Sequence, residues 1–187
     1  MKWKLHVAIA AAIVGAAQAG AQTGFQGMEF VTAVRSGDNG KALQLLEDNP
    51  RIINARDSKG ETALFVAVSE RDSDWTGFLI NKDADPNLAT QSGDTPLIAA
   101  ARIGYTDAAT WLISSGAKVD AANKMGETAL IVAVHNRRMP IIRLLLDKGA
   151  DPDKTDTAAG LSARDYAKRD TRSRDILKLI EAKKPKL

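Results

Sequence analysis

A period of 33 residues is the feature of this 187-residue sequence that most limits its fold. The similar segments GETALFVAVSERD, GDTPLIAAARIGY and GETALIVAVHNRR begin at Gly60, Gly93 and Gly126. A weaker copy, GLSARDYAKRD, begins at Gly160, one residue later than the period requires. Sequence periods of about 20 to 50 residues are typical of solenoids, in which each structural unit contacts only its neighbours. We therefore expect a stack of similar units.

Each unit has the pattern of two helices. Thr62, Thr95 and Thr128 each precede a short apolar run and are suited to cap a helix through the hydroxyl oxygen. Pro96 takes the first helical position, where its missing N–H has no intrahelical partner to lose. A second apolar stretch follows in each unit, and in one unit it ends before Gly116, which favours a left-handed C-cap. The units are therefore predicted to be helix–turn–helix pairs.

The recurring glycine, threonine, leucine and small residues resemble the ankyrin repeat, whose pattern is G-x-T-P-L-H-x-A-A, a turn, a second helix and G-A-D-x-N. The resemblance extends from about Met28 to about Glu181. It implies an all-α solenoid of helix–turn–helix units with β-turn fingers, in which N- and C-terminal capping units flank three full repeats. A single domain, 22–187, is expected to contain repeats at about 28–57, 58–90, 91–123, 124–156 and 157–187.

The sequence departs from this family's pattern in the first helices of the units. Phe65, Ile98 and Ile131 occupy the position of the family's histidine, so apolar contacts are expected to replace the hydrogen bonds that this histidine makes. In the last unit Arg164 replaces the apolar leucine of the first helix, as is expected of a terminal unit with a polar outer face.

Two tryptophans and a glycine on the predicted second helices are interpreted as structural. Trp75 and Trp111 lie in apolar stripes, and core packing between units is the simplest role for such large rings. Gly77 is unfavourable in a helix interior, so it is expected to make room for a neighbouring bulky ring.

The N-terminus has the pattern of a secretory signal peptide. Two lysines in the first four residues precede an apolar run over residues 5–17, and small residues allow cleavage after Ala19 or Ala21. The apolar run is shorter than the roughly 20 residues that span a bilayer. Residues 1–21 are therefore predicted to be removed on export from a bacterial cell, which leaves a periplasmic or secreted protein without a transmembrane segment.

The sequence contains no cysteine and only two histidines, which excludes thiolate nucleophiles and thiolate metal sites. Asp94, followed by Thr95, suggests an acid protease, but Glu61 and Glu127 occupy the same place in other units. The carboxylate is therefore interpreted as part of the repeat. We expect no catalytic residue, metal site, cofactor or nucleic-acid partner, and hence a protein that is not an enzyme.

The resemblance implies that another protein binds to the concave surface, formed by the finger tips and the exposed ends of the first helices. Ile103 and Met125 are apolar where exposure is expected, so we predict a patch around Arg102, Ile103, Tyr105, Met125 and His135. The candidate binding residues on a monomeric protein are Lys59, Glu61, Arg102, Ile103, Tyr105, Lys124, Met125 and His135.

An uneven distribution of charge supports a second reading. Residues 22–156 contain 15 basic and 19 acidic side chains, whereas residues 157–187 contain nine basic and four acidic ones. A basic C-terminal helix is able to dock on anionic lipid or polymer, which would make this a protein associated with the cell envelope. The lysines of that helix are Lys178, Lys183, Lys184 and Lys186.

Overall fold

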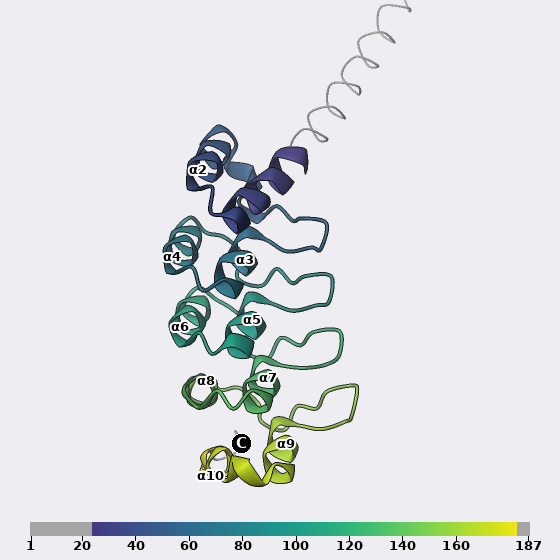
Figure 1. Ribbon diagram of the computed structural model, residues 1–187. Helices are drawn as coiled ribbons and strands as arrows, with labels where there is room; N and C mark the ends of the chain where they lie inside the picture. Colours follow the sequence, from purple (N-terminus) through teal and green to yellow (C-terminus); the bar gives the residue numbers. More distant parts are fainter. Residues whose placement is uncertain (1–23, 183–187) are drawn as a thin grey trace, which may run out of the picture.

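The computed structural model describes residues 24–182, which form a single stack of helical pairs (Figure 1). Residues 24–36 are helical. The elements that follow are α2 (Asn39–Asp48), η1 (Pro50–Asn54), α3 (Ala63–Ser69), α4 (Ser73–Asn81), α5 (Pro96–Ile103), α6 (Thr106–Ser114), α7 (Ala129–His135), α8 (Met139–Asp147), α9 (Ala163–Arg169), η2 (Thr171–Ser173) and α10 (Arg174–Glu181).

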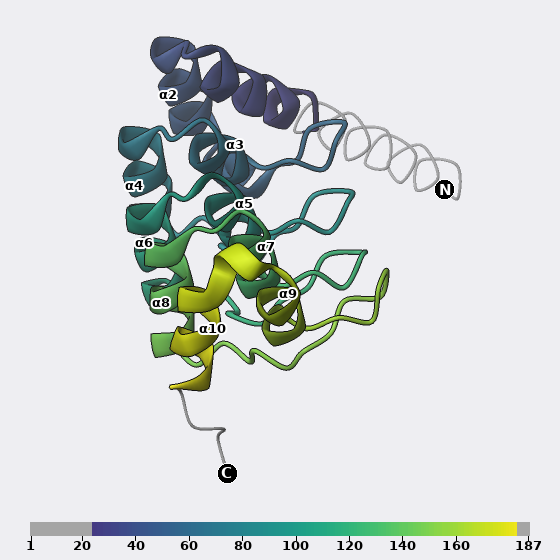
Figure 2. The same cartoon turned by 60° about the horizontal axis from the view of Figure 1, so that its bottom comes forward.

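The helices form two layers, and the fingers project from one of them. The first helices of the units, α3, α5, α7 and α9, stack in one layer, and the second helices, α4, α6, α8 and α10, stack beside them (Figures 1 and 2). The connections before α3, α5, α7 and α9 extend sideways as fingers. The predicted all-α solenoid is therefore confirmed. The first unit, however, is already helical at residue 24, ahead of the predicted start at about 28.

The predicted helix caps are present. The hydroxyl oxygens of Thr62, Thr95 and Thr128 each accept a hydrogen bond from the backbone N–H three residues later, at 3.2 or 3.3 Å. In the last unit Ser162 caps α9 and forms a reciprocal capping box with Asp165. Since removal of such a cap costs about 1 kcal/mol, these polar side chains set where each first helix begins.

The apolar positions that recur with the period form the core. Leu64, Leu97 and Leu130 are at most 1 % exposed. Alanines three residues later on the same helices are equally buried, and their small side chains let α3, α5 and α7 pack closely on one another. The residues in place of the family's histidine are also buried, which confirms that apolar contacts occupy this position; they are Phe65, Ile98 and Ile131.

The turns between first and second helices use a left-handed backbone conformation. Gly104 has φ 77°, while Arg71 and Arg137 take the equivalent places with φ 58° and 50°. Such a conformation costs a residue with a Cβ about 1 kcal/mol. The Arg71 guanidinium donates to the carbonyl of Ile103 at 3.2 Å and lies 5.2 Å from the ring centre of Tyr105. These contacts to the next unit offset the backbone strain.

The predictions for the second helices were right for one tryptophan and wrong for the other. Trp75 is buried, and its Nε1 donates to Oδ1 of Asn39 at 2.6 Å. Trp111 is 37 % exposed, because it is equivalent to the half-buried Phe78 and not to Trp75. The explanation of Gly77 was also wrong, since a Cβ at this position would have no atom within 4 Å.

Candidate protein-binding surface

Backbone hydrogen bonds join successive fingers into a continuous row. The N–H groups of Gln91, Lys124 and Thr157 each donate to a carbonyl near the tip of the preceding finger, at 2.9 or 3.0 Å. Every finger that is followed by another is therefore tied to it through the backbone. We call the fingers and the adjoining ends of the first helices the finger face; its candidate residues are Lys59, Glu61, Arg102, Lys124, Met125 and His135.

Carboxylates in the fingers pair with basic residues near the ends of the first helices. Asp94 Oδ2 lies 2.9 Å from Arg102 Nη2, and Glu61 accepts a hydrogen bond from Arg35. Arg35 also donates to Asp57, whose carboxylate accepts the N–H of Glu61 as well. Burial raises the pKa of Asp57, but these hydrogen bonds outweigh it and leave the pKa below its ordinary value. Asp94 thus forms an ion pair with a first helix, as does Glu61, which occupies the same place in the preceding unit.

Asn123 connects two fingers and was missed in the sequence analysis. The side chain is buried, and its Nδ2 donates to Asp94 and to Glu127, both at 2.9 Å. Its Oδ1 accepts the backbone N–H of Glu127 at 2.9 Å. Asp57 and Asp156 occupy the equivalent positions of other units. A polar side chain that recurs at this position shortly before the finger glycine was the available signal.

His135 lies between a finger carboxylate and an aromatic ring. Its Nδ1 is 3.8 Å from Glu127, and its ring centre is 4.0 Å from that of Tyr166 in an edge-on arrangement. The Tyr166 hydroxyl donates to the carboxylate of Asp156. This hydrogen bond, together with burial, raises the pKa of Tyr166 to about 12, and it lowers the pKa of Asp156. The contacts hold His135 at the edge of the finger face with its side chain 37 % exposed.

The structure divides the predicted binding residues into accessible and inaccessible ones. Lys59 and Lys124 are exposed at finger tips, and Met125 is 54 % exposed. The prediction of Tyr105 as a surface residue was wrong: it is only 6 % exposed, because the guanidinium of Arg71 covers its ring.

The predicted apolar patch is also smaller than expected. Ile103 is half-buried and packs against the core, so it adds little exposed apolar surface. Among the predicted patch residues only Met125 is a large exposed apolar side chain. Polar side chains therefore form most of the finger face, namely the Arg102–Asp94 pair and His135 with Glu127.

Between residues 24 and 182 no cluster of three or more His, Asp or Glu side chains is arranged to hold a metal ion. In the same part of the chain no helix is both long and apolar enough to cross a membrane.

The lysines on which the envelope-docking alternative rests are only partly described. Lys178 is exposed and lies 3.8 Å from Asp175. The other three lysines lie outside the described residues; they are Lys183, Lys184 and Lys186. The predicted signal peptide lies outside them as well.

Comparison with protein families agrees with this geometry. A family model for ankyrin repeats (3 copies) matches residues 30–123 and 72–156, and this chain belongs to the ankyrin-repeat family. A search of curated proteins found no match. Ankyrin repeats are generally modules of protein–protein interaction and are typically not enzymes.

Proposed function

We propose that this protein is a non-catalytic, monomeric module that binds another protein through the finger face. The observation that carries the proposal is the row of fingers linked through backbone hydrogen bonds. A surface held in place before binding loses little conformational entropy when a partner docks, so affinity is gained without rearrangement. The exposed Lys59, Lys124 and Met125 extend from this row toward solvent.

Ion pairs on the finger face support the same role. Arg102 is held by Asp94, yet its side chain remains 42 % exposed, so it is positioned and still accessible. Arginine is among the residues that contribute most to protein interfaces. A partner that contacts both Arg102 and Met125 gains one charged and one apolar contact on neighbouring units.

We further propose that the protein acts in the periplasm or outside the cell. This part of the proposal rests on the signal-peptide pattern of residues 1–21 and on a fold that needs no disulfide. N-terminal sequencing of the protein from fractionated bacterial cells tests it. A new N-terminus at Gly20 or Gln22 in the periplasmic or secreted fraction is expected, whereas an intact N-terminus in the cytoplasm contradicts export.

Site-specific photo-crosslinking in the producing cell tests the binding face. A photoreactive residue is placed at Met125, whose side chain is exposed, with a matched control at the exposed Arg143 of α8, in the second-helix layer. A discrete adduct with another protein from position 125 alone is expected. No adduct at either position, or the same adduct at both, contradicts binding through the finger face.

A double substitution provides the second test. Arg102→Ala with Met125→Ala is expected to leave the circular dichroism spectrum unchanged and to abolish the adduct formed by a photoreactive residue at Lys59. Unchanged crosslinking by this variant contradicts the assignment of Arg102 and Met125 to the binding surface.

A further inference from the structure

Basic side chains gather on the helix turns at the C-terminal end of the stack. The turn after α7, residues 136–140, includes two arginines and no acidic residue, and residues 168–174 include four basic residues and one acid, Asp170. The corresponding turn of an earlier unit, residues 70–74, has three acids and one arginine. The row of turns is therefore acidic toward one end and basic toward the other. We call the basic end the basic edge; it contains Arg137, Arg138, Lys168, Arg169, Arg172 and Arg174.

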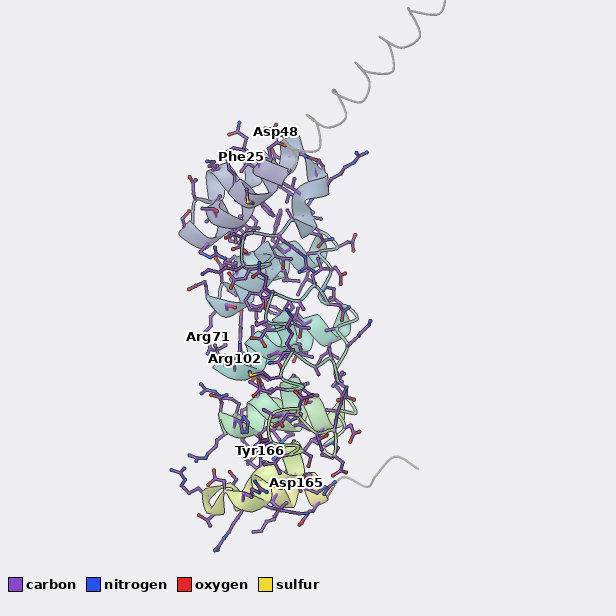
Figure 3. All side chains as sticks on the ribbon, turned by 90° about the vertical axis from the view of Figure 1, so that its right-hand side faces the viewer. Phe25, Asp48, Arg71, Arg102, Asp165 and Tyr166 are labelled. Carbon is purple, nitrogen blue, oxygen red and sulfur yellow. The ribbon has the colours of Figure 1, made fainter. Side chains whose placement is uncertain are left out.

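Direct contacts hold the turns of the basic edge next to one another. Arg137 Nη2 lies 2.8 Å from Asp170 Oδ2, which links the turn after α7 to the turn after α9. Arg138 Nε donates to the carbonyl of Arg102 at 3.3 Å, which links the same turn to the preceding unit. Figure 3 shows Arg102 and Tyr166, from units on either side of α7, on the same side of the stack. The turns after α7 and α9 therefore lie side by side, and their basic residues belong to adjacent units.

The one acid within the turn after α9 is already engaged inside the protein. Asp170 accepts hydrogen bonds from the backbone N–H of Arg172, from Ser173 Oγ and from Arg137. These bonds, with that from Arg172 the largest, hold the pKa of Asp170 well below its usual range, so it remains ionised. The side chains of Lys168 and Arg169 are exposed and form no hydrogen bond or ion pair with any residue between 24 and 182. The carboxylate of Asp165 on the same helix is near enough for both charges to lower its pKa. Their charges are available to a partner.

A hollow of about 240 Å³ lies beside Arg169. Its lining combines the apolar Val134 and the rings of His135 and Tyr166 with three polar side chains, those of Arg169, Asp170 and Ser173. Pockets for whole small molecules are usually larger, about 300 Å³ or more. The volume suits a single apolar side chain that belongs to a longer ligand.

We propose that the basic edge binds an acidic peptide segment of the partner protein. Carboxylates of the segment pair with Arg138, Lys168 and Arg169, and an apolar residue between them enters the hollow next to His135 and Tyr166. Guanidinium groups match carboxylates in a bidentate geometry, which favours acidic side chains as the ligand. This inference rests on the proposed protein-binding function and adds the chemistry of the partner.

The same surface is poorly suited to a membrane. Binding to a lipid surface is strengthened when exposed apolar side chains insert beside the charges. Within residues 24–182 the large exposed apolar side chains lie on other parts of the stack, and none belongs to the basic edge: Phe25, Met28, Leu43, Trp111 and Met125.

The experiment measures fluorescence anisotropy of a labelled peptide in which one leucine is flanked on both sides by glutamates. The full chain is compared with Arg138→Gln/Arg169→Gln and with the matched control Arg143→Gln, whose arginine lies outside the basic edge. The double variant is expected to bind about tenfold more weakly, and the control to bind as the unaltered protein does. Circular dichroism verifies that all three are folded.

Three results overturn the inference: no binding of the peptide, equal weakening in the control, or tighter binding of phosphatidylglycerol vesicles or oligothymidylate than of the peptide. Replacement of the leucine by serine is expected to weaken binding, and equal affinity overturns the role of the hollow. Failure here is separable from failure of the proposed function. An adduct at position 125 without peptide binding contradicts only the proposed role of the basic edge. Peptide binding without that adduct contradicts only the proposed binding through the finger face.

Discussion

Replacement of Gly93 by alanine probes the contact between successive fingers. Gly93 has φ 85°, and a Cβ added there would lie 2.7 Å from the backbone N of Lys124 and 3.0 Å from Cα of Asn123. Gly160 is the equivalent glycine of the last finger, with φ 64°, and a Cβ there would meet no atom within 4 Å. The two glycines share a left-handed backbone and differ in whether another finger lies against them.

This difference predicts unequal losses of stability. Both alanines occupy a left-handed conformation, at a cost of about 1 kcal/mol. Gly93→Ala must also push the next finger away, which weakens the 3.0 Å hydrogen bond from Lys124 N to the carbonyl of Ser92, worth about 1 kcal/mol. Crowding of rigid backbone adds about 1 kcal/mol more. We expect a total loss of about 3 kcal/mol for Gly93→Ala and about 1 kcal/mol for Gly160→Ala.

Urea unfolding followed by far-ultraviolet circular dichroism measures the free energy of unfolding of both variants and of the unaltered protein. The slope of the free energy against urea must be the same in all three, because an end unit of a solenoid is able to unfold separately. Equal losses in the two variants, or a larger loss for Gly160→Ala, would refute the view that close finger packing stabilises the stack.

Further tests address side chains at unit boundaries. Trp75→Ala is expected to lower the free energy of unfolding by about 3 to 5 kcal/mol, whereas Trp111→Ala should cost less than half as much, since its ring is already 37 % exposed. Urea unfolding measures both losses, and similar values would contradict the difference in burial. Arg71→Ala is expected to lower the free energy of unfolding by about 1 to 2 kcal/mol, because its contacts to the next unit are lost. Arg51→Ala is the control and should be nearly neutral. Thermal unfolding compares the two variants, and equal midpoint temperatures would contradict a stabilising role for these contacts. The pKa of Tyr166 is raised from 10 to about 12, so the stability that its hydroxyl contributes is complete below pH 10 and is lost as the pH rises toward about 12. Tyr166→Phe should therefore lose less stability over that interval in parallel unfolding experiments. Identical losses would be inconsistent with the raised pKa.

The sequence was sufficient to predict the local structure, because local structure depends on the nearest residues. Thr62, Thr95 and Thr128 cap helices whose N–H groups lie three residues along the chain. Gly116 adopts the predicted left-handed conformation with φ 91°. The 33-residue period then predicted the stack, since units with the same apolar face bury it only against one another.

Errors arose where burial depends on a neighbouring unit. Tyr105 was predicted at the surface and is covered by Arg71, a residue 34 positions earlier in the sequence. Trp111 was predicted in the core and is partly exposed, because its place on α6 faces outward. Asn123 was overlooked, although it joins two fingers through Asp94 and Glu127. An apolar or polar pattern along one helix does not reveal which side chain of a neighbouring unit covers a residue.

The repeat period, the capping residues and the glycines were enough to establish a helical solenoid of the ankyrin-repeat family. They act through short-range geometry that one segment carries alone, and repetition multiplies the signal. The accessible face of the protein depended on contacts between units about 33 residues apart. The exposure of Met125, the burial of Tyr105 and the gathering of basic charge around Asp170 exist only once the units are stacked, because each is a property of side chains that come from different repeats.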